Sequence, residues 1–68
     1  SVMILLIATI CLQADPVTVE CRSAVWRMDQ TPAACVAMLD PVRAFMTEQT
    51  AGLPVVRILA ACKAGLMG

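Results

Sequence analysis

The residues best suited to chemistry in this chain of 68 residues are its four cysteines, Cys11, Cys21, Cys35 and Cys62. Four cysteines allow three disulfide pairings, and their spacing does not select one. A bond between Cys21 and Cys35 would stabilise the fold by about 3 kcal/mol and leave Cys11 to pair with Cys62. The alternative is four free thiols, because each cysteine falls on an apolar face, where free cysteine is often buried. Disulfides depend on the compartment, which the sequence does not define, so both interpretations stay open.

Metal binding and catalysis are not expected. The sequence contains no His and no C-x-x-C pair, which zinc sites commonly use. A catalytic thiol would need a base or a cationic neighbour to form its thiolate. The carboxylates are expected at turns, helix caps or exposed faces and form no acid/base pair: Asp15, Glu20, Asp29, Asp40 and Glu48. We therefore predict a protein that is not an enzyme and takes no metal or cofactor.

The composition predicts association with other proteins. Five basic and five acidic residues give zero net charge, while 60% of the residues are hydrophobic. Scattered basic residues do not make the clustered positive surface that binds phosphate, so we expect no nucleic-acid partner. A chain of this size buries only about 60% of its unfolded surface. Apolar surface should remain for a partner.

The most apolar segment is Val2–Leu12, and the rest of the chain must be organised around it. It is shorter than the roughly 20 residues that a membrane-spanning helix needs. A signal peptide or membrane anchor and a buried helix are the alternatives. A run rich in Ile, Val and Leu that stops at Asp15-Pro16 favours a strand buried on both faces.

A second strand is predicted after the turn Ala14-Asp15-Pro16. Residues 17–22 alternate strictly, with Val17, Val19 and Cys21 on one side, and residues 23–28 are expected to prolong the strand irregularly. Trp26 lies between Arg22 and Arg27. These residues could anchor an interface, because Trp and Arg are enriched in binding hot spots. Alternatively, Trp26 covers the edge of the core with a guanidinium stacked on it.

A helix should begin after Asp29-Gln30, with Thr31 as N-cap and Pro32 in the first turn. Its apolar stripe has helical spacing and consists of Cys35, Met38, Leu39, Val42, Phe45 and Met46. Pro41 should kink or split the helix, with Asp40 capping the second half. Gly52 should supply a left-handed cap, and Pro54 should prevent continuation.

The last segment, 55–63, is predicted as a strand, with a short helix as the alternative. Val56, Ile58, Ala60 and Cys62 fall on one face, with Arg57 and Lys63 on the other. The chain is therefore expected to be a single α+β domain over residues 1–68, ordered β-β-α-β. A three-stranded sheet would carry one Pro-kinked helix on one face.

One helix leaves the second face of such a sheet uncovered, so this face should meet another copy or a larger partner. The candidate interface residues are Ile4, Leu6, Ile7, Trp26 and Arg27.

The apolar first segment, Cys11-Leu12, Ala14-Asp15-Pro16, Cys21 and Ala34-Cys35 together resemble a group of short, uncharacterised bacterial and prophage-type proteins. The resemblance covers the first half of the chain and implies a phage-linked or exported protein. With the apolar surface, it leads us to expect a non-enzymatic structural protein that oligomerises or docks on a larger assembly. A small virion accessory protein, such as a capsid decoration or cement subunit, is the specific expectation. The alternatives are an exported, disulfide-stapled binding or inhibitor module, periplasmic or extracellular, and a small membrane-associated subunit.

Overall fold

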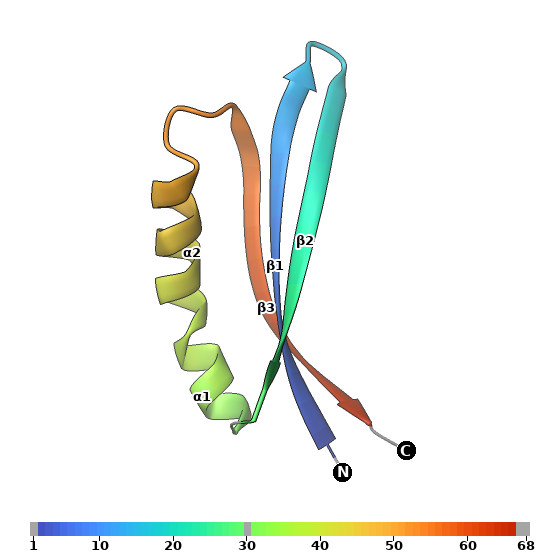
Figure 1. Cartoon of the computed structure of the whole chain (residues 1–68), viewed down its shortest axis with the longest axis vertical. Helices are drawn as coiled ribbons and strands as arrows, with labels where there is room; N and C mark the ends of the chain where they lie inside the picture. The colour runs from blue at the N-terminus through green and yellow to red at the C-terminus, as the bar shows by residue number, and fades with distance from the viewer. Residues whose placement is uncertain (1, 30, 67–68) are drawn as a thin grey trace.

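The structure is a computed structural model that describes residues 2–29 and 31–66. The elements are β1 (Val2–Asp15), β2 (Thr18–Met28), α1 (Pro32–Ala37), α2 (Leu39–Gln49) and β3 (Val55–Leu66). Figure 1 shows the three strands side by side, with α1 and α2 forming one bent helix beside them. The predicted α+β fold with a single helix is confirmed.

The sheet is antiparallel and has the order β2-β1-β3, so β1 is the central strand. Leu6 of β1, for example, lies opposite Trp26 of β2 and Cys62 of β3. The final segment is a strand, as predicted, and it extends past the expected end at residue 63 to Leu66. The central position of β1 explains why the most apolar segment organises the sheet: its backbone is paired along both edges.

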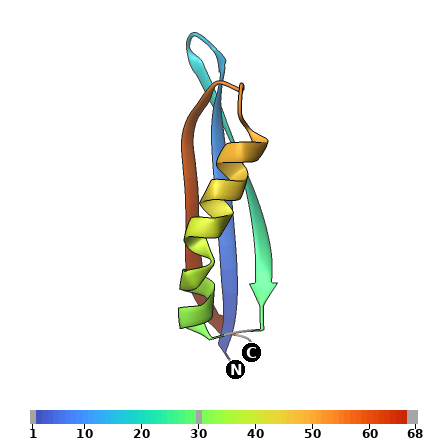
Figure 2. The ribbon, with the colours of Figure 1, turned by 90° about the vertical axis from the view of Figure 1, so that its left-hand side faces the viewer.

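The helix lies over β1 and β3 and leaves β2 to one side, as Figure 2 shows. Ile4, Leu6 and Ala8 face the helix and are only 5%, 2% and 4% exposed. The side chains between them, Leu5 and Ile7, point to the other face of the sheet and are partly exposed. The prediction that the first strand is buried on both faces was therefore wrong, because in the described part of the chain only one face has a helix to cover it.

The start of the helix is as predicted. The Thr31 hydroxyl oxygen accepts a hydrogen bond from the backbone N–H of Ala34 at 3.2 Å, and Pro32 occupies the first turn. The Thr31 hydroxyl satisfies one of the free N–H groups at the start of the helix, and Pro32 has no N–H that would need a partner. Gln30, part of the predicted start, lies outside the described residues.

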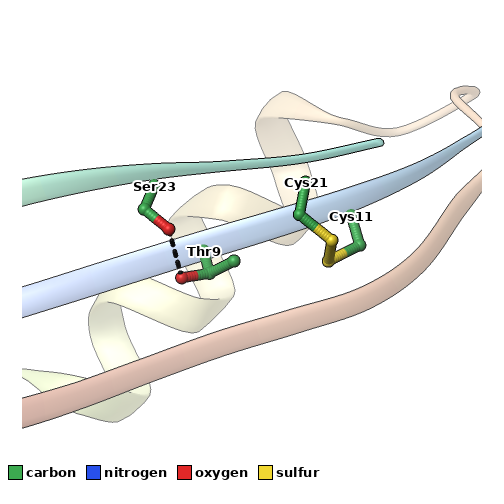
Figure 3. The surroundings of a disulfide bond; sticks show 4 residues. All are labelled: Thr9, Cys11, Cys21 and Ser23. Carbon is green, nitrogen blue, oxygen red and sulfur yellow. Dashed lines mark hydrogen bonds between the residues drawn. A yellow bond between two sulfur atoms is a disulfide. The ribbon is translucent and has the colours of Figure 1, made fainter. Parts of the chain in front are cut away.

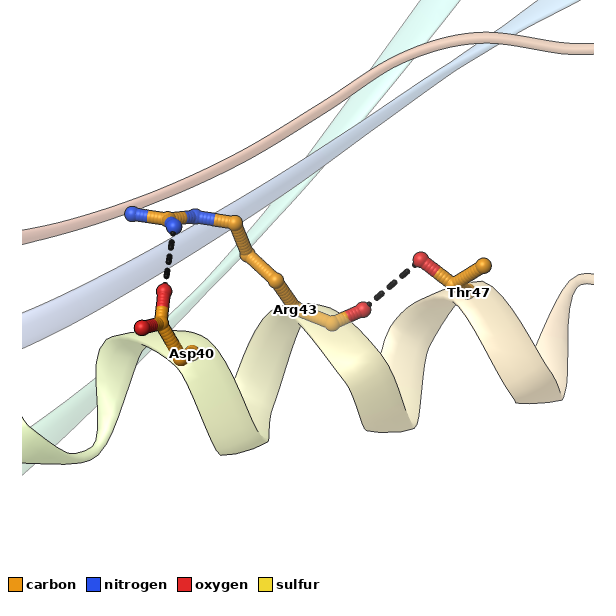
Figure 4. A network of polar contacts seen from close by, with 3 residues as sticks. All are labelled: Asp40, Arg43 and Thr47. Atoms are coloured by element: carbon orange, nitrogen blue, oxygen red, sulfur yellow. Dashed lines mark hydrogen bonds and ion pairs between the residues drawn. The ribbon is translucent and has the colours of Figure 1, made fainter.

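The helix is interrupted at Met38, one turn before Pro41, because a proline has no N–H for the carbonyl of Ala37. The predicted split is confirmed, but the capping role of Asp40 is not. Met38 holds the N-cap position of α2 without a side-chain hydrogen bond. Asp40 lies inside the first turn and pairs with Arg43 at 2.8 Å (Figure 4).

Two turns shape the ends of the elements. The Asp15 carboxylate accepts a hydrogen bond from the backbone N–H of Val17 at 2.9 Å, so that β2 begins at Thr18 and not at Val17. This bond, followed by one from the Thr18 side chain, lowers the pKa of Asp15 below its ordinary value of 3.8. Gly52 has φ of 86° after α2, as its predicted left-handed role requires.

Candidate interaction surface

The four cysteines form two disulfides, Cys11–Cys21 and Cys35–Cys62, and no cysteine is free. The pairing considered from the sequence, Cys21 with Cys35 and Cys11 with Cys62, was wrong. Cys11 and Cys21 are direct partners in the β1–β2 register. Cys62 shares the helix face of the sheet with its register partner Leu6, which places it beneath Cys35.

The sequence contains a pattern that predicts the Cys11–Cys21 disulfide. Cys11 and Cys21 are equally distant from Pro16, so a hairpin that turns at Asp15-Pro16 brings them opposite each other. No comparable local symmetry relates Cys35 to Cys62, because that pairing depends on where the helix crosses the sheet.

The Cys11–Cys21 disulfide lies on the sheet face opposite the helix (Figure 3). Beside it, the hydroxyls of Thr9 and Ser23 are 2.8 Å apart and hydrogen-bonded. A covalent bond and a polar bond therefore join β1 to β2 on the face that neither α1 nor α2 covers. They hold β2 in place although α1 and α2 lie over the other two strands.

An apolar groove of about 530 Å³ runs between the helix and β2. Leu6 and Met28 line it from the sheet, and Met38 and Phe45 from the helix side, with Trp26 on the β2 wall. The walls are open to solvent, since Trp26 is 49% and Phe45 62% exposed. Large apolar patches of this kind on a small protein commonly mark binding sites.

Charged side chains lie along the same helix-facing side of β2. Glu20 and Arg22 line a second hollow, of about 180 Å³, together with Ile10, Leu12 and Thr50. Their register partners on β1 are Leu12 and Ile10, which carry no charge. This side of β2 thus has an apolar end at Trp26 and a charged end at Glu20.

The predicted interface residues lie in three different parts of the molecule. Ile4 and Leu6 lie in the core beneath the chain's own helix, and Leu6 also borders the groove. Ile7 points to the opposite face, towards its register partner Val25, which is 56% exposed. Trp26 and Arg27 both line the groove. The core-edge role considered for Trp26 fits its position, but its exposure leaves half of the side chain for a partner.

Phe45, Met38, Val25 and Val19 also belong to the exposed apolar surface but were not singled out as interface residues from the sequence. Helical spacing placed Phe45 and Met38 on the core stripe, yet they lie on its edge beside uncovered β2. Periodicity identifies an apolar face but does not say how far a neighbouring element covers it.

Over residues 2–29 and 31–66, no helix has both the length and the apolar character needed to cross a membrane. No group of three metal-ligating side chains occurs in this part of the chain either.

No protein-family model matches the sequence, and no curated protein or solved structure matches it. The resemblance to prophage-type proteins therefore stays a prediction.

Proposed function

We propose that this chain is a non-enzymatic interaction protein that binds another polypeptide through the β2 side of the molecule. The observation that carries the proposal is the position of the helix over β1 and β3, which leaves β2 uncovered. Every residue of β2 except the last is exposed, and the groove beside it is lined almost wholly by apolar side chains. Such surface is stabilised by removal from water.

The two disulfides favour an exported, disulfide-stapled form of such a module, because disulfides persist in oxidising compartments. Protein isolated from its natural source under denaturing conditions should then contain no free thiol. The narrower role of capsid decoration or cement subunit stays a prediction from the sequence.

Site-specific photo-crosslinking in the cells that make the protein tests the proposed surface. A photoreactive side chain replaces Phe45, which lines the groove and is 62% exposed. The matched control replaces Val36, which is 58% exposed on α1 and does not line the groove.

We expect a discrete crosslinked protein from position 45 and none from position 36. The mass of the product tells a second copy from a different protein. Equal crosslinking at the two positions, or none at either, would contradict the proposal.

A further inference from the structure

We propose that the partner is a second copy of this chain, paired antiparallel along the free edge of β2 about a two-fold axis at Cys21. The inference rests on the proposed function and names the partner for the same side of the molecule. The paired sheets would join into one, with both helices on the same side. The two grooves would lie at opposite ends of the paired strands, because each groove borders Trp26, five residues from the axis.

The outer edge of β2 has no strand beside it among the described residues, since β1 pairs only with its inner edge. An open edge is a template for another strand, and proteins usually protect it with Pro, charged side chains or a covering element. The sequence of β2, TVECRSAVWRM, contains no Pro, and its charged side chains, Glu20, Arg22 and Arg27, include both signs. Charges of both signs can pair across such an edge and need not block it. The other edge strand, β3, is contacted by both α1 and α2.

The backbone of β2 has groups directed at such a partner. The Cα atoms of Cys11 and Cys21 are 4.0 Å apart, the short spacing of a pair that exchanges no backbone hydrogen bonds. The N–H and C=O of Cys21 therefore point away from β1, and so do those of Val19 and Ser23, two residues to either side. In a pair centred on Cys21, Val19 of one copy lies opposite Ser23 of the other.

The charges of β2 select this register. With the axis at Cys21, Glu20 of each copy lies opposite Arg22 of the other, on the helix side of the sheet. Moving the axis to Glu20 would place two glutamates opposite each other, and moving it to Arg22 would place two arginines there. Like charges directly opposite destabilise a strand pair, whereas opposite charges stabilise it.

The second edge strand lacks this self-complementarity. The charged residues of β3 are Arg57 and Lys63, both positive, so no self-pairing register of β3 forms an ion pair. The charges thus favour β2 over β3 as the edge that joins two copies.

Exposed valines support the same register. Val17, Val19 and Val25 are 92%, 49% and 56% exposed, although each is apolar. With the axis at Cys21, Val19 of one copy lies diagonal to Val25 of the other, and Val17, in the turn just before β2, lies level with the same Val25. The pairing therefore removes apolar side chains of both copies from water.

Charge reversal with rescue, read by sedimentation equilibrium on the disulfide-bonded protein, tests the pairing. The wild type should form dimers. Glu20→Arg or Arg22→Glu alone places like charges opposite each other and should weaken dimerisation by about tenfold or more. The double variant Glu20→Arg/Arg22→Glu restores both ion pairs and should return to within about threefold of the wild type. Glu48→Arg, an equal charge change on the exposed side of α2, is the control and should have no effect.

A backbone variant gives a second readout. Val19→Pro removes an N–H that points outward and leaves the β1–β2 ladder intact, so it should give a folded monomer with both disulfides. A wild type that stays monomeric, single reversals without effect, a double variant without rescue, or a dimeric Val19→Pro would each overturn the inference.

These outcomes are distinguishable from failure of the proposed function. A monomeric wild type that crosslinks from position 45 to a different protein would support the proposed function and contradict the self-pairing. A dimer that is weakened by Phe45→Asp but not by the charge reversals would also support the proposed function and contradict pairing along the edge of β2. A monomeric wild type that gives no crosslink would contradict both the proposed function and the self-pairing.

Discussion

At the scale of single residues, local polar bonds and disulfides fix the points where the chain must turn or cross. Asp15 holds the hairpin turn through the N–H of Val17, and Thr31 caps the start of the helix. Both roles follow from residue type and position in the sequence. The disulfide pairing does not, because it depends on the register and on where the helix lies.

The turn carboxylate predicts a pH dependence. The folded pKa of Asp15 is lowered by the N–H of Val17, so its contribution to stability is present above the unfolded value and is lost as the pH falls through the folded pKa. An NMR titration of the Asp15 carboxyl should give a midpoint below 3.8. The variant Asp15→Asn keeps an acceptor oxygen and should remove this titration. A midpoint at or above 3.8 in the wild type would contradict the role of the turn.

At the scale of elements, the sequence was sufficient for the type and order of the strands and for the split near Pro41. Alternation defined β2, and helical spacing defined the stripe of α1 and α2. These patterns did not predict where the helix lies across the sheet. An apolar stripe shows which side of a helix is buried but not which two strands lie beneath it. The groove beside β2 could therefore not be predicted, although Trp26 on its wall was singled out.

The two disulfides should differ in what they contribute to stability. Cys35–Cys62 joins residues 27 apart and ties the helix to β3, whereas Cys11–Cys21 joins residues only 10 apart. The chain-entropy model gives about 3.5 kcal/mol for the longer loop and about 2.7 kcal/mol for the shorter one. Cys35 is also fully buried, so its replacement loses packing as well.

Denaturant unfolding of Cys35→Ala/Cys62→Ala and of Cys11→Ala/Cys21→Ala measures this difference. We expect the first pair to lower the free energy of unfolding more than the second. Each double variant serves as the control for the other, since both remove one disulfide. An equal or larger loss for the hairpin disulfide would show that the helix does not depend on its tie to β3.

At the scale of the whole molecule, the chain has more apolar surface than its fold covers. Of a sequence that is 60% hydrophobic, only six hydrophobic residues are buried in the described part of the chain. The molecule is thin, with principal extents of 45 × 24 × 12 Å, so most side chains lie near a surface. The composition predicted this surplus. Its location beside β2 follows from the helix covering the other two strands.

Amide hydrogen exchange along β2, measured at low and high protein concentration, tests the pairing of that edge most directly. The outward N–H groups of Val19, Cys21 and Ser23 should exchange freely in dilute protein and become protected as concentration rises. The inward N–H groups of Arg22 and Ala24, bonded to β1, should be protected at both concentrations. If Val19, Cys21 and Ser23 exchange freely at every concentration while Arg22 and Ala24 stay protected, the edge of β2 has no second copy beside it.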